Sequence, residues 1–147
     1  MKFDNLHSDI DCNCITKEVK ENTVDIFLYK LYKNDMTIEE FQSYWEKGQK
    51  RRHNPCERIC MLKGISVEKA INNDIEIEIL SKFKETEEIK PKEKEKYKYY
   101  CSLRFRKDAG MVWKTGEGKY HHTFFKCDDF NVELLEIIEV KPLENNV

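Results

Sequence analysis

The sequence predicts an α+β fold, a single domain over residues 1–147 with an N-terminal strand and two to three helices followed by an antiparallel β-meander. Residues 97–106 alternate between apolar and polar side chains, which is the pattern of a half-buried strand. The middle of the chain instead carries apolar residues at helical spacing behind candidate capping residues. With 147 residues, 39% of them hydrophobic, the chain can bury one core.

The N-terminal elements follow from local patterns. Residues 1–22 have no consistent periodicity, and we expect a loose or strapping segment. Residues 24–32, VDIFLYKLY, are rich in β-branched and aromatic side chains and predict a central strand covered on both faces. A helix is then expected from Thr37, because Glu40 follows three residues later in the capping-box pattern.

Two further helices are predicted in the middle of the chain. Residues 55–64, PCERICMLKG, predict a short helix that stops at Gly64. Residues 67–83 are ambiguous, because their isoleucines alternate as in a strand and also line a helical stripe. The length of this stretch and a possible cap at Ser66 favour a helix.

The last third predicts sheet beyond a charged connector. Residues 84–96 are almost all charged and predict a flexible surface connector inside the single domain. Residues 111–115 and 120–126 flank a glycine-containing turn and predict a β-hairpin. Residues 134–140, LLEIIEV, predict a final, well-buried strand.

Composition limits the compartment and the partners. No apolar run approaches the roughly 20 residues of a membrane-spanning helix, so no membrane partner is expected. Acidic residues stand where a signal peptide would have its apolar region, and we expect a cytoplasmic protein whose six cysteines are reduced. The net charge is −2, but residues 97–127 carry seven Lys or Arg against two acidic residues. Such asymmetry either marks an anion-binding face or reflects chance along a short chain.

Two adjacent histidines in GKYHHTFF, residues 118–125, are the candidate catalytic residues. Successive side chains of a strand point to opposite faces, so His121 and His122 cannot both face one ligand. One histidine near its ordinary pKa can act as an acid, a base or a hydrogen-bond donor to an anion. The alternative is that one is a surface residue and the other a hydrogen-bonded residue at the edge of the core.

A basic and aromatic sheet face could complete this site. If the polar face of the 97–106 strand lies beside the hairpin, guanidinium groups could hold phosphate and an indole could stack on a base. The predicted ligand-binding residues are Arg104, Arg106, Trp113, Lys114 and Thr123. The other interpretation is an ordinary solvated strand face.

The hairpin register is not determined by the sequence. A four-residue loop over 116–119 would place Trp113 opposite His122, and a five-residue loop would place it beside His121. Both registers remain open at this stage.

The cysteines offer a possible zinc site. Cys12 and Cys14, with His53, Cys56 and Cys60, supply enough ligands. However, the CxC half-site is less common than CxxC, and Cys56 and Cys60 lie on one apolar helical face. We therefore expect no metal and no cofactor. The sequence also carries no Walker loop, GxSxG, HExxH or GxGxxG motif.

The segments CMLKGISVEKA, residues 60–70, and GKYHHTFF resemble a group of small bacterial proteins. That group combines a Cys-x-x-x-Gly-(Leu/Ile)-Ser segment with a C-terminal His-His-Thr-aromatic motif, and the resemblance covers about two thirds of the chain. This sequence departs from the pattern at Phe124-Phe125, where the group has Trp. The resemblance implies no activity, but it indicates which residues to test: Gly64, Ser66, His121, His122 and Thr123.

A more distant similarity is to the ADP-ribosyltransferase type of fold. In that fold a basic residue on an early strand, a serine-containing segment and a later acidic residue surround NAD. The similarity would assign these roles to Lys30, Ser66 and Glu136 or Glu139. The spacing of these residues does not itself require the arrangement.

The sequence thus favours binding of an anionic ligand, a nucleotide or RNA, on a basic and aromatic sheet face around the His-His-Thr motif. It leaves open whether the protein is an enzyme; if chemistry occurs, general acid–base transfer by histidine is expected. The alternative is a protein-interaction module, such as an immunity or regulatory protein, with a protein partner and no small-molecule site.

Overall fold

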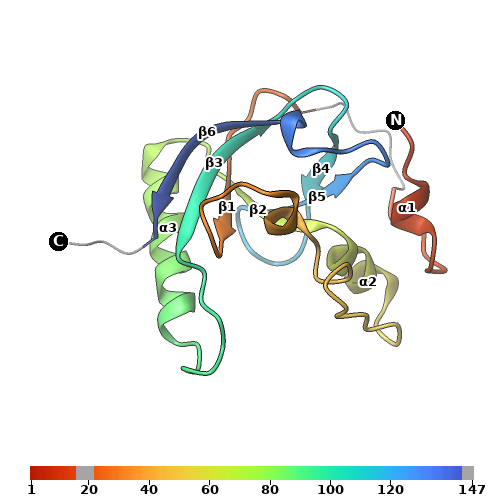
Figure 1. The fold of residues 1–147 in the computed structure, drawn as a ribbon, viewed down its shortest axis with the longest axis horizontal. Helices are drawn as coiled ribbons and strands as arrows, with labels where there is room; N and C mark the ends of the chain where they lie inside the picture. The colour runs from red at the N-terminus through yellow and green to blue at the C-terminus, as the bar shows by residue number, and fades with distance from the viewer. Residues whose placement is uncertain (16–21, 144–147) are drawn as a thin grey trace.

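A computed structural model describes residues 1–15 and 22–143. It confirms the α+β class: helices pack on one antiparallel sheet of six strands in the order β4-β5-β2-β1-β3-β6 (Figure 1). In chain order the elements are α1 (Asp4–His7), β1 (Phe27–Leu31), the 3-10 helix η1 (Ile38–Phe41), α2 (Cys56–Lys63), β2 (Ile65–Lys69), α3 (Asn73–Glu88), β3 (Tyr99–Phe105), β4 (Gly110–Lys114), β5 (His121–Lys126), the 3-10 helix η2 (Val132–Leu134) and β6 (Leu135–Pro142).

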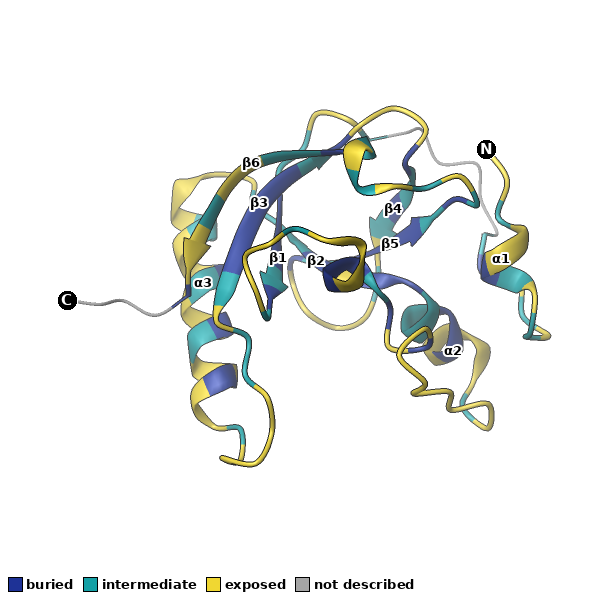
Figure 2. Ribbon diagram, in the orientation of Figure 1, coloured by how far each residue is buried: buried dark blue, intermediate teal, exposed yellow. Residues whose placement is uncertain are grey.

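The main core lies on one face of this sheet. Strand β1 is central, between β2 and β3, and Phe27 and Leu31 are completely buried, as the apolar run predicts. One face of β3 is as predicted, because Cys101, Leu103 and Phe105 all join this core. The strand is not half-buried, however, because Tyr100 packs with α3 on the opposite face and Ser102 is buried there as well. Figure 2 shows the result as dark blue along β1 and β3.

Two separate covers protect the opposite face. Helix α3 covers β1 and β3, where Ile79 and Phe83 pack with Leu28. At the other end of the sheet, the N-terminal segment and α2 cover β4 and β5, packing Leu6 and Cys60 with Phe125. The middle of this face, on β2 and β5, lies between the two covers.

Strand β2 is the element that the sequence interpretation missed. Ser66 lies inside this strand and does not cap a helix. Helix α3 begins later, and the side chain of its N-cap Asn72 accepts a hydrogen bond from the backbone N–H of Ile75 at 2.9 Å. Residues 67–83 therefore contain the end of β2 and the first part of α3, and the alternating isoleucines of this stretch, Ile75, Ile77 and Ile79, all belong to the helix.

Helix α3 also extends into the predicted connector, through Glu88. Glu87 is buried, and its carboxylate accepts hydrogen bonds from Lys90 and from the backbone N–H of Tyr97. These bonds fix the end of α3 against the chain that returns to β3. The charged run over 84–96 is thus partly a helix with a buried anchor, which corrects the prediction of a connector along its whole length.

Two other predictions need correction. The segment after Thr37 forms only a 3-10 turn, because Glu40 accepts from the backbone N–H groups of Tyr32 and Lys33 instead of capping a helix at Thr37. Strand β6 is an edge strand with many exposed residues, so it is not well buried. The antiparallel C-terminal strands broadly fit the predicted meander, with β6 beside β3 and the β4–β5 hairpin at the far edge of the sheet.

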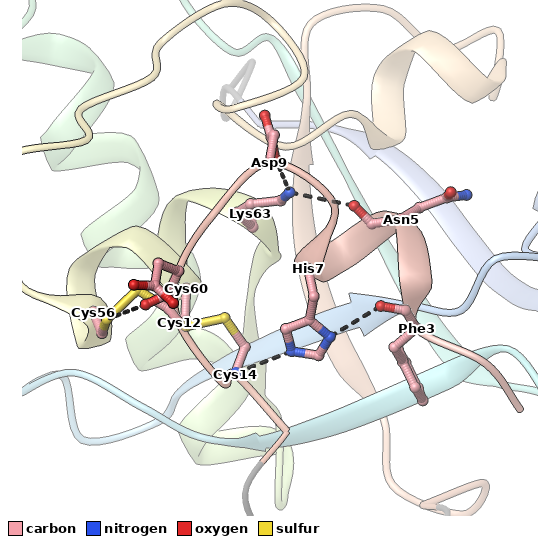
Figure 3. The surroundings of a disulfide bond; sticks show 10 residues. Phe3, Asn5, His7, Asp9, Cys12, Cys14, Cys56, Cys60 and Lys63 are labelled. Atoms are coloured by element: carbon pink, nitrogen blue, oxygen red, sulfur yellow. Dashed lines mark hydrogen bonds and ion pairs between the residues drawn. A yellow bond between two sulfur atoms is a disulfide. The ribbon is translucent and has the colours of Figure 1, made fainter.

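Four cysteines form two disulfides, Cys12–Cys56 and Cys14–Cys60, whereas Cys101 and Cys127 are free and buried. The expectation of six reduced thiols is therefore wrong for these four. Cys12 and Cys14 are two residues apart on an extended segment, and Cys56 and Cys60 occupy one face of α2. The two bonds clamp the N-terminal segment onto that helix (Figure 3).

Polar contacts reinforce the clamp. His7 lies at 3.0 Å from the carbonyl oxygen of Phe3 through Nδ1, and its Nε2 accepts the backbone N–H of Cys14. Asp9 forms a 2.6 Å ion pair with Lys63 at the end of α2 (Figure 3). The strapping segment predicted at the N-terminus is fixed by these contacts over its described part, residues 1–15.

Within the described ranges, none of the helices has the length and apolar character needed to cross a bilayer.

Candidate functional site

A cavity opens where the sheet divides. Strands β1 and β2 pair over only two positions, Phe27 with Lys69 and Leu28 with Glu68. Beyond them, β1 continues to pair with β3 and β2 with β5, so the two strands diverge. The resulting cavity has a volume of about 360 Å³. We call it the fork cavity. Polar, charged and aromatic side chains of its wall include Lys30, Tyr44, Lys47, Ser66, Glu68, Lys82, Lys119 and His121.

Lysine side chains dominate the charge of the fork cavity. Lys30 comes from β1, Lys47 from the loop after η1, Lys82 from α3 and Lys119 from the β4–β5 loop. Lys30 reaches Glu87 at 3.4 Å, whereas the other three form no ion pair with any residue in the described ranges. Positive charge converging on a concave wall without carboxylate partners favours an anionic ligand.

Glu68 is the one carboxylate that the described residues contribute to the wall. It stands at the last β1–β2 pair, at the apex of the fork, and faces His121 across the β2–β5 ladder. Burial raises the pKa of its carboxyl, and the positive groups around it, including His121 and Lys30, oppose that shift. A half-buried carboxyl with a raised pKa beside a histidine is typical of acid–base sites.

His121 is held through one of its ring nitrogens. Its Nδ1 lies 3.0 Å from the carbonyl oxygen of Thr115 and 3.1 Å from the hydroxyl oxygen of the same residue. The hydroxyl of Thr115 is itself 2.6 Å from that of Thr123, which is completely buried. The other nitrogen, Nε2, has no hydrogen-bond partner within residues 1–15 and 22–143, and His121 lines the cavity.

His122 belongs to the opposite face of the sheet, as the strand geometry predicts. Its ring lies 5.5 Å from that of Phe27 in the main core, and its Nδ1 lies 3.0 Å from the carbonyl oxygen of Tyr120. Burial lowers its pKa. The cavity therefore contains one of the two adjacent histidines.

Neither hairpin register considered from the sequence is correct. The structure pairs Trp113 with Thr123 and Lys114 with His122, and residues 116–120 form the loop. Trp113 packs edge-on against Phe125 beneath the disulfide-bonded segment, and Lys114 donates a hydrogen bond to the carbonyl oxygen of Gly118.

The predicted basic face is not assembled as one surface. Strands β1 and β2 separate β3 from β5, so Arg104 lies three strand spacings from His121, or about 14 Å. Arg104 instead donates to the carbonyl oxygen of Val24 and pairs with Glu136. Arg106 is exposed just beyond the end of β3. The sequence analysis expected β3 to lie beside the β4–β5 hairpin, but β2, which it did not recognise, lies between them together with β1.

The residues indicated by the two resemblances are partly brought together. Gly64, Ser66 and His121 line the fork cavity, and Thr123 pairs with Ser66 across β2 and β5. Lys30 and Ser66 also share the cavity. Glu136 and Glu139, the acidic residues suggested by the ADP-ribosyltransferase similarity, lie on edge strand β6 beyond β3.

No family model, curated protein or solved structure matches the chain. Within the described residues, no group of three or more His, Cys, Asp or Glu side chains is arranged to hold a metal ion. The four cysteines weighed as zinc ligands are the four that form disulfides.

Proposed function

We propose that the fork cavity binds an anionic ligand that carries a phosphate group, a nucleotide or a stretch of single-stranded RNA. The observation that supports this most directly is the convergence of Lys47, Lys82 and Lys119, none of which forms a direct ion pair with a described carboxylate, on a wall whose one described carboxylate is Glu68. A volume of about 360 Å³ lies within the range typical of small-molecule sites.

An aromatic ring supports a ligand with a base. Tyr44 lines the cavity and 41% of its surface is exposed, although most large apolar side chains of the fold are buried. An exposed tyrosine beside lysines offers a stacking surface next to phosphate contacts, which is how single-stranded nucleic acids are commonly held. The exposed hydroxyl of Ser66 adds a hydrogen-bonding group on the sheet side.

The cytoplasmic location predicted from the sequence requires both disulfides to be reduced there. Formed as they are in the structure, Cys12–Cys56 and Cys14–Cys60 favour an oxidising compartment. Acid-quenched thiol alkylation of the protein from its native cells distinguishes the cytoplasm from an oxidising compartment. In the cytoplasm the four cysteines would be thiols and would be alkylated without added reductant, whereas in an oxidising compartment they would react only after reduction.

Binding is tested by fluorescence anisotropy with a labelled single-stranded 12-mer and by competition with mononucleotides. We expect Lys82→Ala to weaken binding at least fivefold, because it removes a cavity charge, and binding to weaken as salt increases. Lys107→Ala is the matched control: Lys107 is exposed on the β3–β4 turn and does not line the cavity. Equal losses in both variants, or no binding by any of these ligands, would reject the proposal and favour the protein-interaction alternative.

A further inference from the structure

We infer that the fork cavity cleaves single-stranded RNA by transesterification, with Glu68 as the general base and His121 as the general acid. This inference rests on the proposed binding function and adds a reaction to it.

The geometry of the Glu68–His121 pair carries the inference. The two residues are direct partners in the antiparallel β2–β5 ladder, on the same face of the sheet. Directly opposed residues in such a ladder have Cβ atoms about 4.5–5.5 Å apart. Both side chains line the fork cavity, so a single phosphodiester held there can be reached by a carboxylate and by an imidazole at the same time.

The hydrogen bonding of His121 suits the role of acid. When the ring is protonated, its Nδ1 donates to the carbonyl oxygen of Thr115, which fixes the orientation of the ring. Nε2 is then the nitrogen that presents a proton to a ligand, and no described group competes for it. A histidine oriented by a backbone carbonyl, with its other nitrogen in a cavity, has the arrangement that general acid catalysis requires.

The reaction balances without an added reactant. The Glu68 carboxylate removes the proton of a ribose 2′-hydroxyl, and the 2′-oxygen forms a bond to the adjacent phosphorus. The bond from phosphorus to the 5′-oxygen of the next nucleotide breaks, and Nε2 of His121 delivers its proton to that oxygen. The products are a 2′,3′-cyclic phosphate and a 5′-hydroxyl. Proton exchange with water then returns Glu68 and His121 to their starting states.

The lysines supply the remaining requirement, which is to stabilise negative charge on the non-bridging phosphate oxygens. Lys30 is the best placed, because its ion pair with Glu87 and its position over the ring of Tyr97, 4.8 Å from the centroid, hold its ammonium group in the cavity wall. Lys82 lines the same cavity from α3.

RNA is favoured over other phosphate esters because it contains its own nucleophile. Attack by a neighbouring 2′-hydroxyl needs a base, an acid and a cationic group, and the described wall of the cavity provides all three. DNA has no 2′-hydroxyl and cannot react in this way, so it becomes an inert ligand for the same surface.

The test uses the full chain and two single-stranded 12-mers of one sequence, one RNA and one DNA. We expect the wild-type protein to cleave only the RNA, leaving 2′,3′-cyclic phosphate and 5′-hydroxyl ends that mass spectrometry identifies. Glu68→Gln and His121→Asn should each lower the cleavage rate at least about 100-fold, the lower end of the usual effect of a general acid or base. The Asn side chain keeps a donor near the position of Nδ1 and lacks the nitrogen that corresponds to Nε2.

Controls separate this inference from the binding proposal. His122→Asn makes the same substitution on the opposite face of the sheet and should cleave within about threefold of wild type. DNA affinity should stay within about threefold in both site variants, which also shows that they are folded. If DNA binds and wild-type protein leaves the RNA intact, the cleavage inference fails while the binding proposal stands. If neither strand binds, the binding proposal fails. Cleavage that persists in Glu68→Gln and His121→Asn would also overturn the inference.

Discussion

Gly64 and Thr123 are packed so closely, where α2 ends and β2 begins, that a Cβ at residue 64 would overlap the Thr123 methyl group. Such a Cβ would also lie 3.0 Å from the backbone oxygen of Phe124 and 3.0 Å from the ring of Phe125. The backbone at Gly64 is extended, so the requirement for glycine is one of space and not of φ. This close approach brings β2 onto β5 and so sets the position of Glu68 opposite His121.

Gly64→Ala is therefore expected to lower the free energy of unfolding by about 1–3 kcal/mol, the usual cost of overpacking a dense core. Urea denaturation measures the change. Ser66→Ala is the control, since Ser66 is exposed two residues later and its loss should change stability by less than about 0.5 kcal/mol. Equal stability of wild type and Gly64→Ala would show that β5 can move away from α2.

The elements with one clear periodicity were predictable from the sequence. Strand β1 is nearly all apolar and is buried on both faces, and the apolar residues that alternate along β3 lie on its core face. The polar residues of β3 did not reveal that α3 covers its other face. Strand β2 was not recognised, because its five residues run into α3 and the combined stretch fits a helical stripe. The disulfides were missed because pairing depends on which segments meet in space, and four cysteines in two clusters leave that open.

The candidate site shows the same limit. His121 was predictable as one of two adjacent histidines, since strand geometry assigns them to opposite faces. Glu68 was not predictable, because it lay within a segment assigned to a helix. Ser66 and Glu68 point to the same face of the sheet only if this segment is a strand, which the sequence did not reveal. The cavity forms because β1 and β2 pair over only two positions and then diverge. This divergence depends on residues far apart in the sequence, and no local pattern in either strand predicts it.

The two disulfides should contribute strongly to stability. They join residues 44 and 46 positions apart, and closing a loop of this length is worth about 4 kcal/mol for the first bond and less for the second, because the two loops overlap over most of their length. Dithiothreitol should therefore lower the melting temperature. Alkylation under denaturing conditions without reductant should label only Cys101 and Cys127. Labelling of all six cysteines would contradict the assigned pairs.

Asp9 should make stability depend on pH at the acidic end. Its hydrogen bond from Lys63 is the largest of several causes that lower its pKa from 3.8 to about 2. At a pH between these two pKa values, the unfolded chain binds the proton of Asp9 more readily than the folded chain does. The ionised Asp9 therefore stabilises the folded state fully above about pH 4, and this stabilisation is lost as the pH falls towards 2.

Asp9→Asn should remove this dependence. Because the Asp9 side chain is 34% exposed and screened by solvent, we expect a difference of only about 1 kcal/mol between wild type and Asp9→Asn at pH 6. Urea denaturation at pH 6 and pH 2.5 measures both values. The gap between the two proteins should narrow at the lower pH; a gap that stays constant would show that Asp9 acts through packing alone.

The pH profile of RNA cleavage gives the last prediction. Glu68 must be ionised to act as a base, and burial raises the pKa of its carboxyl above the ordinary 4.5. The groups that oppose this shift approach from four elements: His121 on β5, Lys114 on β4, Lys30 on β1 and Lys82 on α3. As the pH rises, the rate should therefore increase through an acidic limb that lies above pH 4.5, where Glu68 becomes ionised.

Glu68→Gln should abolish the acidic limb of that profile. Lys82→Ala should instead move the acidic limb to higher pH, because it removes a positive charge that favours the ionised carboxylate. Initial rates between pH 4 and pH 9 at constant ionic strength measure both effects, with Lys107→Ala as the charge-matched control whose profile should overlay that of wild type. If the acidic limb stays at the same pH in both Lys82→Ala and Glu68→Gln, then a group other than Glu68 causes it. The general base would then be another residue of the fork cavity.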